Sequence, residues 1–551
     1  MENFKYKPEA LDKYMNEIGS RAAAESGIPS DRYHFGKLVL QSLKDDPDFV
    51  CQIDGGTGES ETNASVLRRS IRCTTSFKKL GLKIGDVITV MGSNNIDQPI
   101  LLYAALFEGI IMSAIDRTLG VNELTHLFIT NKPKLIFCHG DKVQEVKKAV
   151  ELARCDAKII SYDRNPDAIT FSDMMEKYGE DIDAQAYRAA NFDSEETTAL
   201  IVATSGSTGL PKSAILTHKN VTASTTFFGC FGTKFPRPTK SGIVLSPIQW
   251  LSAIVHYIQG PIFQYTIIQS SKELTTDHIF ELFNKYKPTF ALSSPPMLIS
   301  LLQESQTKEC DFSALEFVMV GGSAVPNHLL PMLHERAPNA RLGIGYGSSE
   351  YGGITLYPFD LPFGSCGKAA SHMEYKLMSV ETGEEVKEPF KTGELWAKAP
   401  GGFKGYYNRP EDTAEALTED GWLKSGDLLY RDENWNFFFV ERIKLLLKYR
   451  NHQVSPVELE AVIHKLPGVL NVAVSGVPDP DCGELPIAFV VPKPGSGLTE
   501  KDVEDIVKEN LTDSKFLRGG VVFMDALPLL PTSKLDRKKL RQLAAELTKK
   551  K

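Results

Sequence analysis

The segment from Thr204 to Lys212 carries the residue types that hold a phosphate group. It reads Thr-Ser-Gly-Ser-Thr-Gly-Leu-Pro-Lys and follows an apolar, strand-like run at residues 199–203. Glycines let backbone N–H groups approach a phosphate closely, hydroxyl groups add donors, and a lysine adds positive charge. We therefore predict a phosphate-binding loop in which Lys212 supplies the charge, formed by Thr204, Ser205, Gly206, Ser207, Thr208 and Gly209.

This loop does not fit the Walker A pattern, GxxxxGK[ST], read from Gly206. Pro211 stands where that pattern requires its second glycine. Because proline has no backbone N–H to donate there, we reject a standard P-loop ATPase or kinase. A bland alternative is an ordinary strand-to-helix turn rich in glycine, serine and threonine, and the Pro-Lys ending makes that alternative the weaker one.

Composition limits the class of protein that carries this loop. The chain has 551 residues, 42% hydrophobic and 24% charged, with a formal net charge of −8. Single hydrophobic cores stop growing near ~300 residues, so several subdomains are expected. An acidic chain of this kind is not primarily a nucleic-acid binder. Eight cysteines are scattered without metal-ligand spacing and are expected to be reduced packing residues.

The elements that must position the loop follow an α/β pattern. Between about residues 86 and 346, apolar runs alternate with longer segments of helical character; the runs are 87–90, 135–138, 199–202 and 317–320. Strands that are apolar on both faces fit a sheet buried between helices. The apolar stretch 100–115 is too short to span a bilayer and is expected to be a buried helix.

The pattern changes after about residue 441, where a separate α+β domain is expected. We expect strands at 445–447, 472–477, 487–491 and 521–523. One helix should open at Ser455, with Pro456 in its first turn and Glu458 completing a capping box, and another at Thr499. Leucines 540, 543 and 547 should pack a basic C-terminal helix on this domain; a helix that lies on a membrane surface is the weaker alternative.

Further segments of the chain resemble the motifs of a known family. Together with the loop, they resemble the adenylate-forming superfamily of AMP-binding enzymes, which includes acyl-CoA synthetases, 4-coumarate–CoA ligases and firefly luciferases. They occur in that superfamily's order, as Gly345-Tyr-Gly-Ser-Ser-Glu350, Gly393-Glu-Leu-Trp396, Gly405-Tyr-Tyr-Asn408, Trp422-Leu-Lys-Ser-Gly-Asp427, Glu441-Arg442 with Lys444, Lys448–Val454 and Pro531-Thr-Ser-Lys534. The resemblance implies a large domain, residues 1–440, with two sheet-and-helix layers and a small β-barrel. A mobile α+β domain, residues 441–551, would follow it.

The resemblance also implies roles for individual residues. Lys534 would be the catalytic lysine, Glu350 would bind Mg²⁺, Glu441 would be the hinge, and Lys444 and Lys448 would serve thioester formation. The nucleotide would be held by Gly345, Tyr346, Gly347, Ser349, Asp427 and Arg442, with Arg442 also catalytic. The acyl pocket would be walled by Trp250, Gly321, Gly322 and Ser323.

Some positions depart from the family pattern. Trp250 aligns with a histidine of beetle luciferases and coumarate ligases, and an indole cannot accept a proton. Ser213, Asn451 and Ser533 stand where glycine is usual. Trp250 therefore disfavours a beetle-type light reaction, although it can wall the carboxylate end of an acyl pocket or simply pack in the core.

The resulting expectation is an ATP- and Mg²⁺-dependent ligase that joins a small carboxylic acid to CoA through an acyl adenylate. The alternatives are a luciferase that oxidises the adenylate, an ATPase or kinase, and a non-catalytic nucleotide-binding relative. We expect a monomer or homodimer without nucleic-acid partners or transmembrane segments. The compartment is expected to be intracellular, cytoplasmic or peroxisomal, although the C-terminus lacks Ser-Lys-Leu.

Overall fold

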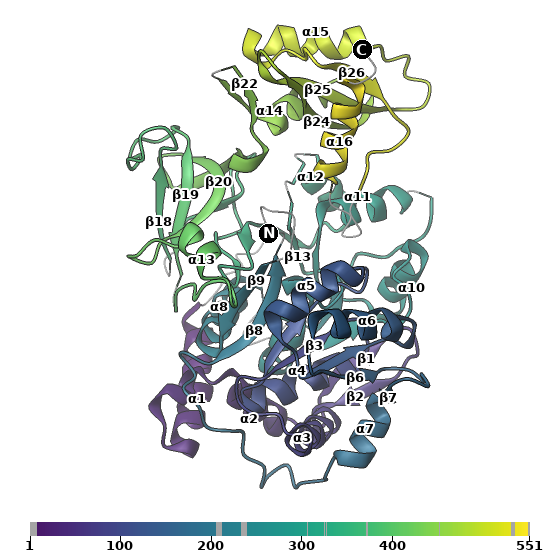
Figure 1. Ribbon diagram of the computed structural model, residues 1–551, viewed down its shortest axis with the longest axis vertical. Coiled ribbons are helices and arrows are strands. Elements are labelled where there is room, and N and C mark those ends of the chain that lie inside the picture. Colours follow the sequence, from purple (N-terminus) through teal and green to yellow (C-terminus); the bar gives the residue numbers. More distant parts are fainter. Residues whose placement is uncertain are drawn as a thin grey trace. The chain divides into compact units, whose positions relative to one another are not determined.

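The computed structural model describes residues 8–204, 212–232, 240–305, 307–323, 325–326, 328–370, 373–399, 401–450, 452–529 and 535–548. The chain forms two compact units (Figure 1). Unit 1 comprises Met1–Asp360, Ala370–Glu374 and Lys398–Leu423, and unit 2 comprises Leu361–Ala369, Tyr375–Ala397 and Lys424–Lys551. The boundary expected near residue 441 stays a prediction.

One seven-stranded sheet of unit 1 carries the start and end of the phosphate loop. Its strand order is β7 (Ile169–Thr170), β6 (Lys158–Ser161), β5 (Leu135–Cys138), β3 (Val87–Val90), β4 (Ile111–Ala114), β8 (Thr198–Thr204) and β9 (Lys212–Thr217). Neighbours are parallel except β8 and β9, which are antiparallel. One face packs on α5 (Val121–Asn131) and α6 (Val143–Ala153).

A second seven-stranded sheet of unit 1 has the order β14 (Arg341–Gly345), β13 (Phe317–Gly321), β12 (Phe290–Ser293), β10 (Ser241–Val244), β11 (Thr266–Gln269), β1 (Val50–Asp54) and β2 (Ser60–Thr62). It is parallel apart from the antiparallel pair β1 and β2. Helices α10 (Thr276–Tyr286), α11 (Pro295–Glu304) and α12 (Leu329–Arg336) cover one face.

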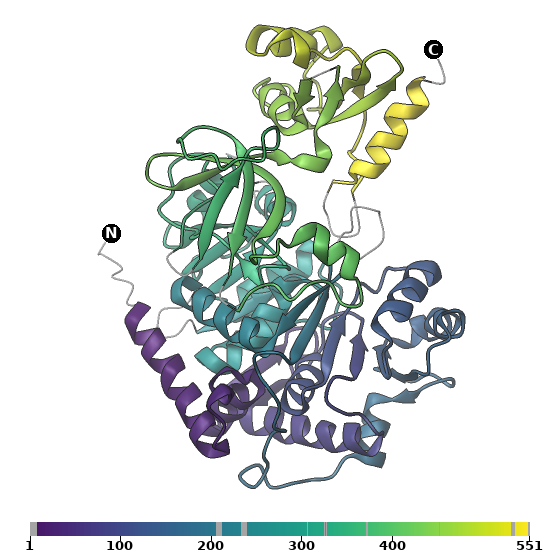
Figure 2. The ribbon, with the colours of Figure 1, turned by 60° about the vertical axis from the view of Figure 1, so that its left-hand side comes forward.

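A central helical layer joins the remaining faces of the two sheets. It contains α2 (Phe35–Asp45), α3 (Asn63–Lys79), α4 (Asp97–Glu108), α8 (His218–Gly232) and α9 (Leu251–Phe263), whose buried side chains share one core with both sheets. At the edge of unit 1, α1 (Pro8–Ser26) packs on α2 and α8, and α7 (Phe171–Tyr178) packs on α3 (Figure 2). The predicted α/β class, with strands at 87–90, 135–138, 199–202 and 317–320, is confirmed.

The apolar stretch 100–115 is not a single helix, so that prediction was wrong. Helix α4 ends at Glu108, because Gly109 takes a left-handed conformation with φ 66° and its N–H bonds back to Ala105. Residues Ile111–Ala114 then form β4, a parallel strand with all four residues buried. Glycine suits this helix end because it has no Cβ to oppose a positive φ. Among the helices of the described ranges, none combines the length and hydropathy needed to cross a bilayer.

Unit 2 contains most of a five-stranded sheet, where the resemblance implied a small β-barrel. The strand order is β17 (Gly367–Lys368), β21 (Asn436–Arg442), β20 (Leu423–Arg431), β19 (Gly393–Lys398) and β18 (Glu374–Met378). A second sheet of unit 2 has the order β23 (His452–Val454), β22 (Leu447–Tyr449), β25 (Gly483–Pro492) and β24 (Val469–Asp479), with β26 (Gly520–Phe523) paired to β25.

Helices cover both faces of this second sheet, as Figure 1 shows. One face packs on α14 (Pro456–Ile463) and α15 (Glu500–Asn510), and the other packs on α16 (Arg537–Thr548). The basic C-terminal helix therefore buries Leu540 on this domain, as predicted; the Leu547 side chain lies outside the described residues. The expected strand at 445–447 is displaced, because residues 443–445 form a 3₁₀ turn and the strand begins at Leu447.

Candidate active site

Three of the predicted segments follow neighbouring parallel strands. Trp250 comes after β10, Gly321 ends β13 and Gly345 ends β14, and β12 lies between β10 and β13. The carboxyl ends of parallel strands lie at the same sheet edge, which is where open α/β sheets bind their ligands. The structure therefore brings the predicted pocket walls and the segment 345–350 to one edge of unit 1.

Gly321 needs to be a glycine because the backbone of Gly345 approaches it closely. The two residues are partners in the β13–β14 register, and a Cβ added to Gly321 would lie 2.5 Å from the Gly345 carbonyl oxygen. Gly322 has φ +89°, a conformation that disfavours other residues, and both Gly322 and Ser323 are exposed. Close backbone approach thus explains Gly321, and the positive φ explains Gly322, without any ligand.

A small hairpin presents Glu350. It consists of β15 (Gly347–Ser348) paired with β16 (Gly353–Ile354). The Thr355 N–H donates to the Tyr346 carbonyl at 2.8 Å, and the Gly352 N–H donates to the Ser349 carbonyl at 3.0 Å. The backbone is thereby fixed on both sides of Glu350, which is half-buried.

The phosphate loop joins two strands rather than a strand and a helix. Thr204 lies opposite Lys212 at the open end of the antiparallel pair β8–β9, and the Thr204 hydroxyl donates to the Lys212 carbonyl at 3.4 Å. Ser205, Gly206, Ser207, Thr208 and Gly209 lie outside the described residues. In a P-loop, the lysine opens a helix. The strand that begins at Lys212 therefore supports the rejection of a P-loop NTPase.

Four side chains of unit 1, which we call the Lys212 cluster, join the loop to the Glu350 hairpin: Lys212, Tyr406, Glu350 and Asp412. The Lys212 ammonium forms an ion pair with the Asp412 carboxylate and lies 5.2 Å from the centre of the Tyr406 ring. The Tyr406 hydroxyl donates to Glu350 Oε1 at 2.9 Å. Burial, followed by the charge of Glu350, raises the pKa of Tyr406, so its hydroxyl stays protonated and acts as a donor.

Tyr406 and Asp412 were missed as site residues. The segment 405–408 fits the superfamily order, but nothing local marks Tyr406 as a partner of Glu350. The segment runs beside β9, because the Ile215 N–H donates to the Gly405 carbonyl at 3.0 Å and the Tyr407 N–H donates to the Ser213 carbonyl at 2.8 Å. Asp412 lies in the first turn of α13 (Pro410–Ala416), where an acidic residue is common whatever its function.

An open cavity of about 480 Å³ lies beside the Lys212 cluster in unit 1. Tyr406 lines it together with basic and polar side chains. The lining residues include Lys404, Asn408, Arg409 and Thr413. Lys404 is paired with Glu196 at 2.6 Å, and an Arg409 guanidinium N–H lies 2.6 Å from the His126 ring. The cationic groups of this cavity are therefore already engaged within unit 1.

Trp250 occupies the N-cap position of α9 and is half-buried. The preceding loop is fixed from two sides. The Asn94 amide, in the loop after β3, donates to the Ser246 carbonyl at 2.9 Å, and the hydroxyls of Ser246 and of Ser252 on α9 lie 2.6 Å apart. A half-buried indole at a strand's carboxyl edge fits a pocket wall better than full core packing. Its role in acid binding stays a prediction.

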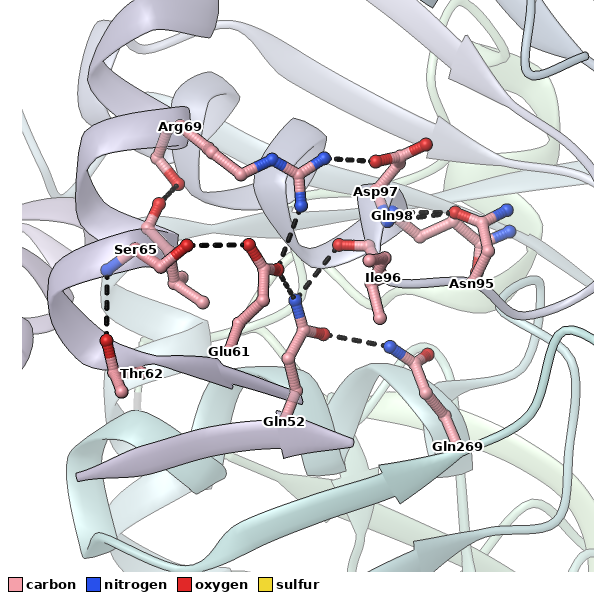
Figure 3. Close-up of polar contacts among 12 residues, drawn as sticks. Gln52, Glu61, Thr62, Ser65, Arg69, Asn95, Ile96, Asp97, Gln98 and Gln269 are labelled. Atoms are coloured by element: carbon pink, nitrogen blue, oxygen red, sulfur yellow. Dashed lines mark hydrogen bonds and ion pairs between the residues drawn. The ribbon is translucent and has the colours of Figure 1, made fainter. Parts of the chain in front are cut away.

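A buried polar network supports the loop that carries Asn94 (Figure 3). Arg69 on α3 contacts Glu61 at 2.8 Å and also pairs with Asp97 at the start of α4. The Gln52 amide donates to Glu61 at 2.7 Å, and the Gln269 amide donates to Gln52 at 2.8 Å. Burial raises the pKa of the Asp97 carboxyl, and the charge of Arg69 opposes that rise. These contacts tie β1, β2 and β11 to the central helices.

The predicted ribose-binding residue Asp427 lies in unit 2. It is buried in β20, opposite Arg442 in β21, and Arg442 Nε lies 3.2 Å from Asp427 Oδ1. Glu394 supports the turn before Asp427, because it accepts the Gly426 N–H at 2.9 Å and the Trp396 indole N–H at 2.7 Å. The structure therefore brings Asp427 and Arg442 together and explains the segment 393–396 as their support.

The side chain of Glu441, which lies in β21, contacts the start of α14. Its side chain is buried, and Oε2 accepts the Ser455 hydroxyl at 3.2 Å and the Val457 N–H at 3.0 Å. Ser455 caps the helix through the Glu458 N–H at 3.3 Å, but the Glu458 carboxylate pairs with Lys515 at 2.6 Å. The expected capping box is therefore incomplete, and Glu441 supplies the second acceptor. Lys444 and Lys448 are exposed and separate from Glu441's contacts.

Lys534 lies outside the described residues, as do Ser533 and Asn451. The described residues on either side of the segment 530–534 are held by hydrogen bonds. Leu529 and Leu535 form a β-bridge, and the Asp536 N–H donates to the Pro528 carbonyl at 2.9 Å. Arg537 binds Glu460 with both guanidinium nitrogens, at 2.6 and 3.0 Å. This two-point contact fixes the start of α16.

These features define a class of α/β proteins in which the candidate site segments lie at the carboxyl ends of parallel strands. Comparison with known proteins gives the family: the model of the AMP-binding enzyme family matches residues 40–407, and that of the AMP-binding enzyme C-terminal domain matches residues 458–534. The chain therefore belongs to the adenylate-forming family of AMP-binding enzymes.

Individual relatives cover nearly the whole chain. Luciferin 4-monooxygenase of Photuris pensylvanica is 31% identical, covering 92% of this chain and 94% of its own length. 4-Coumarate-CoA ligase 1 of Narcissus pseudonarcissus is 29% identical, covering 94% and 95%. The crystal structure of ATP-bound MatB from Rhodopseudomonas palustris matches the fold with a TM-score of 0.82 at 22% identity, covering 92% and 99%.

Proposed function

We propose that this protein is an AMP-forming acid–CoA ligase that works in two half reactions. In the first, a carboxylate oxygen of the acid attacks the α-phosphorus of ATP, the bond to the β-phosphate oxygen breaks, and pyrophosphate leaves. In the second, the CoA thiol loses its proton and attacks the acyl carbon, and AMP leaves with the bridging oxygen. The observation that carries the proposal is the Lys212 cluster, in which the lysine of the phosphate loop meets Glu350 through Tyr406.

In the first half reaction, the residues of the site would offset negative charge and hold the substrates in place. Lys212 would neutralise phosphate charge, and Lys534 would stabilise the charge on the α-phosphoryl oxygens and the attacking carboxylate. Asp427 would accept hydrogen bonds from the ribose hydroxyls, with Arg442 beside it. In the segment 345–349, the Tyr346 ring would pack on the adenine.

Glu350 is the residue that would hold Mg²⁺. Magnesium is usually bound by one or two carboxylates together with substrate phosphates, rather than by a cage of protein ligands. A single half-buried carboxylate that already accepts the Tyr406 hydroxyl fits that mode, and the described residues contain no cluster of three or more His, Cys, Asp or Glu ligands. When bound, Mg²⁺ would offset phosphate charge and help pyrophosphate to leave.

The second half reaction would use the residues around the proposed hinge. Glu441 would absorb the backbone change of a domain rotation, and hinge residues need not be small. Lys448, with Lys444 nearby in sequence, would then lie on the face used by the thiol. The compartment, cytoplasmic or peroxisomal, and the oligomeric state remain predictions.

A luciferase-type reaction is the second candidate, because a luciferin 4-monooxygenase covers most of the chain at 31% identity. Adenylation is common to both candidates, so they differ only in the fate of the adenylate. Trp250 disfavours a beetle-type light reaction, since an indole cannot accept a proton as the aligned histidine can.

The proposed function is tested by acid-dependent exchange of labelled pyrophosphate into ATP. The acids should range over chain length and aromaticity, and each assay should run with and without CoA, with light recorded on luciferin. We expect exchange with at least one acid and a CoA thioester when CoA is added. Light emission without a thioester would favour the luciferase, and orthophosphate release without AMP would contradict both candidates.

Lys534→Ala separates the half reactions. We expect this variant to lose adenylate formation by orders of magnitude, because the charge at the α-phosphorus is no longer offset. It should retain thioester formation from a preformed acyl adenylate, which is measured by mass spectrometry. Equal loss in both half reactions would contradict the assigned role.

A further inference from the structure

Lys212, the lysine of the predicted phosphate loop, is engaged by a protein carboxylate. Its ammonium pairs with Asp412, and the two side chains are only 11% and 21% exposed. Charges shielded from water attract more strongly than a surface pair, which is worth ~1 kcal/mol or less. An incoming phosphate must therefore compete with the Asp412 carboxylate for the Lys212 ammonium.

The Asp412 carboxylate is held in place by its surroundings. It lies in the first turn of α13, which starts at Pro410. The next residue, Thr413, accepts the Tyr406 N–H at 2.9 Å and donates to the Arg409 carbonyl at 2.8 Å. Tyr406 therefore contacts both members of the pair's surroundings: its N–H binds Thr413 at the start of α13, and its ring lies beside the Lys212 ammonium.

We propose that Asp412 is a positioning residue that stands in for a nucleotide phosphate. It holds the Lys212 ammonium beside Tyr406 until ATP binds, and the ammonium then passes from the carboxylate to the phosphates. This inference rests on the proposed function, since it takes Lys212 to be a phosphate ligand. Asp412 acts through Lys212 and makes no bond to the reacting atoms.

The proposal has a definite energetic consequence. A carboxylate and a triphosphate are both anionic, so they compete for the same ammonium and repel each other. If the pair occupies Lys212 for about nine-tenths of the time, the apparent dissociation constant for ATP is raised about tenfold. Asp412 thus lowers the affinity for ATP while keeping Lys212 in place.

The test measures ATP binding by calorimetry without acid or CoA. Asp412→Asn should bind ATP about tenfold more tightly than the wild type, if the competing carboxylate sets the affinity as above. Glu411→Gln is the matched control, because Glu411 is an exposed acid in the same turn and its loss changes the net charge equally. Its affinity should stay within about twofold of the wild type, as expected for an exposed charge.

Two further variants keep the inference falsifiable. Asp412→Glu keeps a carboxylate and should bind ATP as the wild type does. In a Lys212→Met background, Asp412→Asn should lose most of its effect, because Asp412 acts through that lysine; the double-mutant cycle measures this coupling. Inorganic pyrophosphate, used as a second probe, should show the same order of affinities.

Equal or weaker ATP binding by Asp412→Asn, or an undiminished effect without Lys212, would overturn the inference. These outcomes differ from a failure of the proposed function. If the wild-type protein bound no ATP, the proposed function itself would be wrong. If the wild type bound ATP and Asp412→Asn bound it with the same affinity, only the role given to Asp412 would be wrong.

Discussion

At the scale of the residue, Tyr406 links segments that are far apart in the chain. Its hydroxyl bonds to Glu350, 56 positions away, and its ring lies beside Lys212. A phenol suits this position because the hydroxyl orients a carboxylate while the ring face attracts an ammonium. Tyr406 therefore couples the predicted metal ligand to the predicted phosphate ligand.

Tyr406→Phe tests this coupling. The variant keeps the ring near Lys212 and loses the hydrogen bond to Glu350. Hydrogen bonds to charged groups contribute ~1.5–3 kcal/mol, so we expect the rate of acid-dependent pyrophosphate exchange to fall about tenfold or more. Tyr407→Phe is the control, because Tyr407 meets β9 through its backbone. Equal rates for the two variants would contradict the role of Tyr406.

At the scale of the element, the Arg69 network joins α3 and α4 to β2 (Figure 3). Arg69→Met leaves Glu61 and Asp97 without the guanidinium. Removing one partner of a fully buried pair costs about 3 kcal/mol or more, and Arg69 and Asp97 are each 24% exposed, so we expect the free energy of unfolding to fall by about 1–3 kcal/mol at neutral pH. Urea denaturation measures it, with the exposed neighbour in Arg68→Met as the control.

The pH dependence of this cost has a definite sign. Burial raises the pKa of Asp97, and loss of Arg69 should raise it further. A carboxyl with a raised folded-state pKa destabilises the protein most when it is ionised, and the penalty fades as the pH falls. The difference between Arg69→Met and the wild type should therefore be smaller at pH 5 than at pH 7.5. A larger difference at pH 5 would contradict the account.

The sequence predicted individual helices and strands better than it predicted their borders and their pairing. Strands such as Val87–Val90 are buried on both faces, and that pattern is local. The stretch 100–115 was predicted wrongly because its helix and its strand are both mostly apolar and fully buried, so only Glu108 and Gly109 mark their border. Strand β9 has no strong local signal, since its pairing with β8 is a tertiary property.

The candidate site could be predicted as a set of segments and not as a set of contacts. Lys212 and Glu350 stand out because their motifs have a recognisable order. The ion pair of Lys212 with Asp412 depends on the path of the chain between the second sheet and α13, which no local pattern encodes. Asp412 and Tyr406 therefore emerge only from the folded chain.

At the scale of the molecule, a buried histidine pair links the N-terminal segment to the core of unit 1. His34 lies against Phe192 and His218, with ring centres 4.1 and 5.1 Å away, and its Nε2 is 3.0 Å from the Ala190 carbonyl. Burial, followed by the charge of Lys37, lowers the pKa of His34 to about 4. Burial also lowers the pKa of His218. Both rings are therefore neutral at physiological pH.

This pair predicts acid sensitivity. The unfolded chain binds protons on these rings below about pH 6.5 and the folded chain does not, so stability falls as the pH drops from 6.5 towards 4. His34 alone should cost about 2 kcal/mol between pH 7.5 and pH 5. His34→Asn, which keeps an acceptor for the Lys37 N–H, should show a smaller fall in urea denaturation. An unchanged fall, matching exposed His334→Asn, would contradict this.

The central claim is that the acid becomes a mixed anhydride with AMP. It is tested by supplying the accepted acid with both carboxylate oxygens labelled as ¹⁸O, together with ATP and CoA, and analysing the products by mass spectrometry. The account predicts one ¹⁸O atom in each AMP formed and none in the released pyrophosphate. Label found in orthophosphate, or AMP without label, would contradict it.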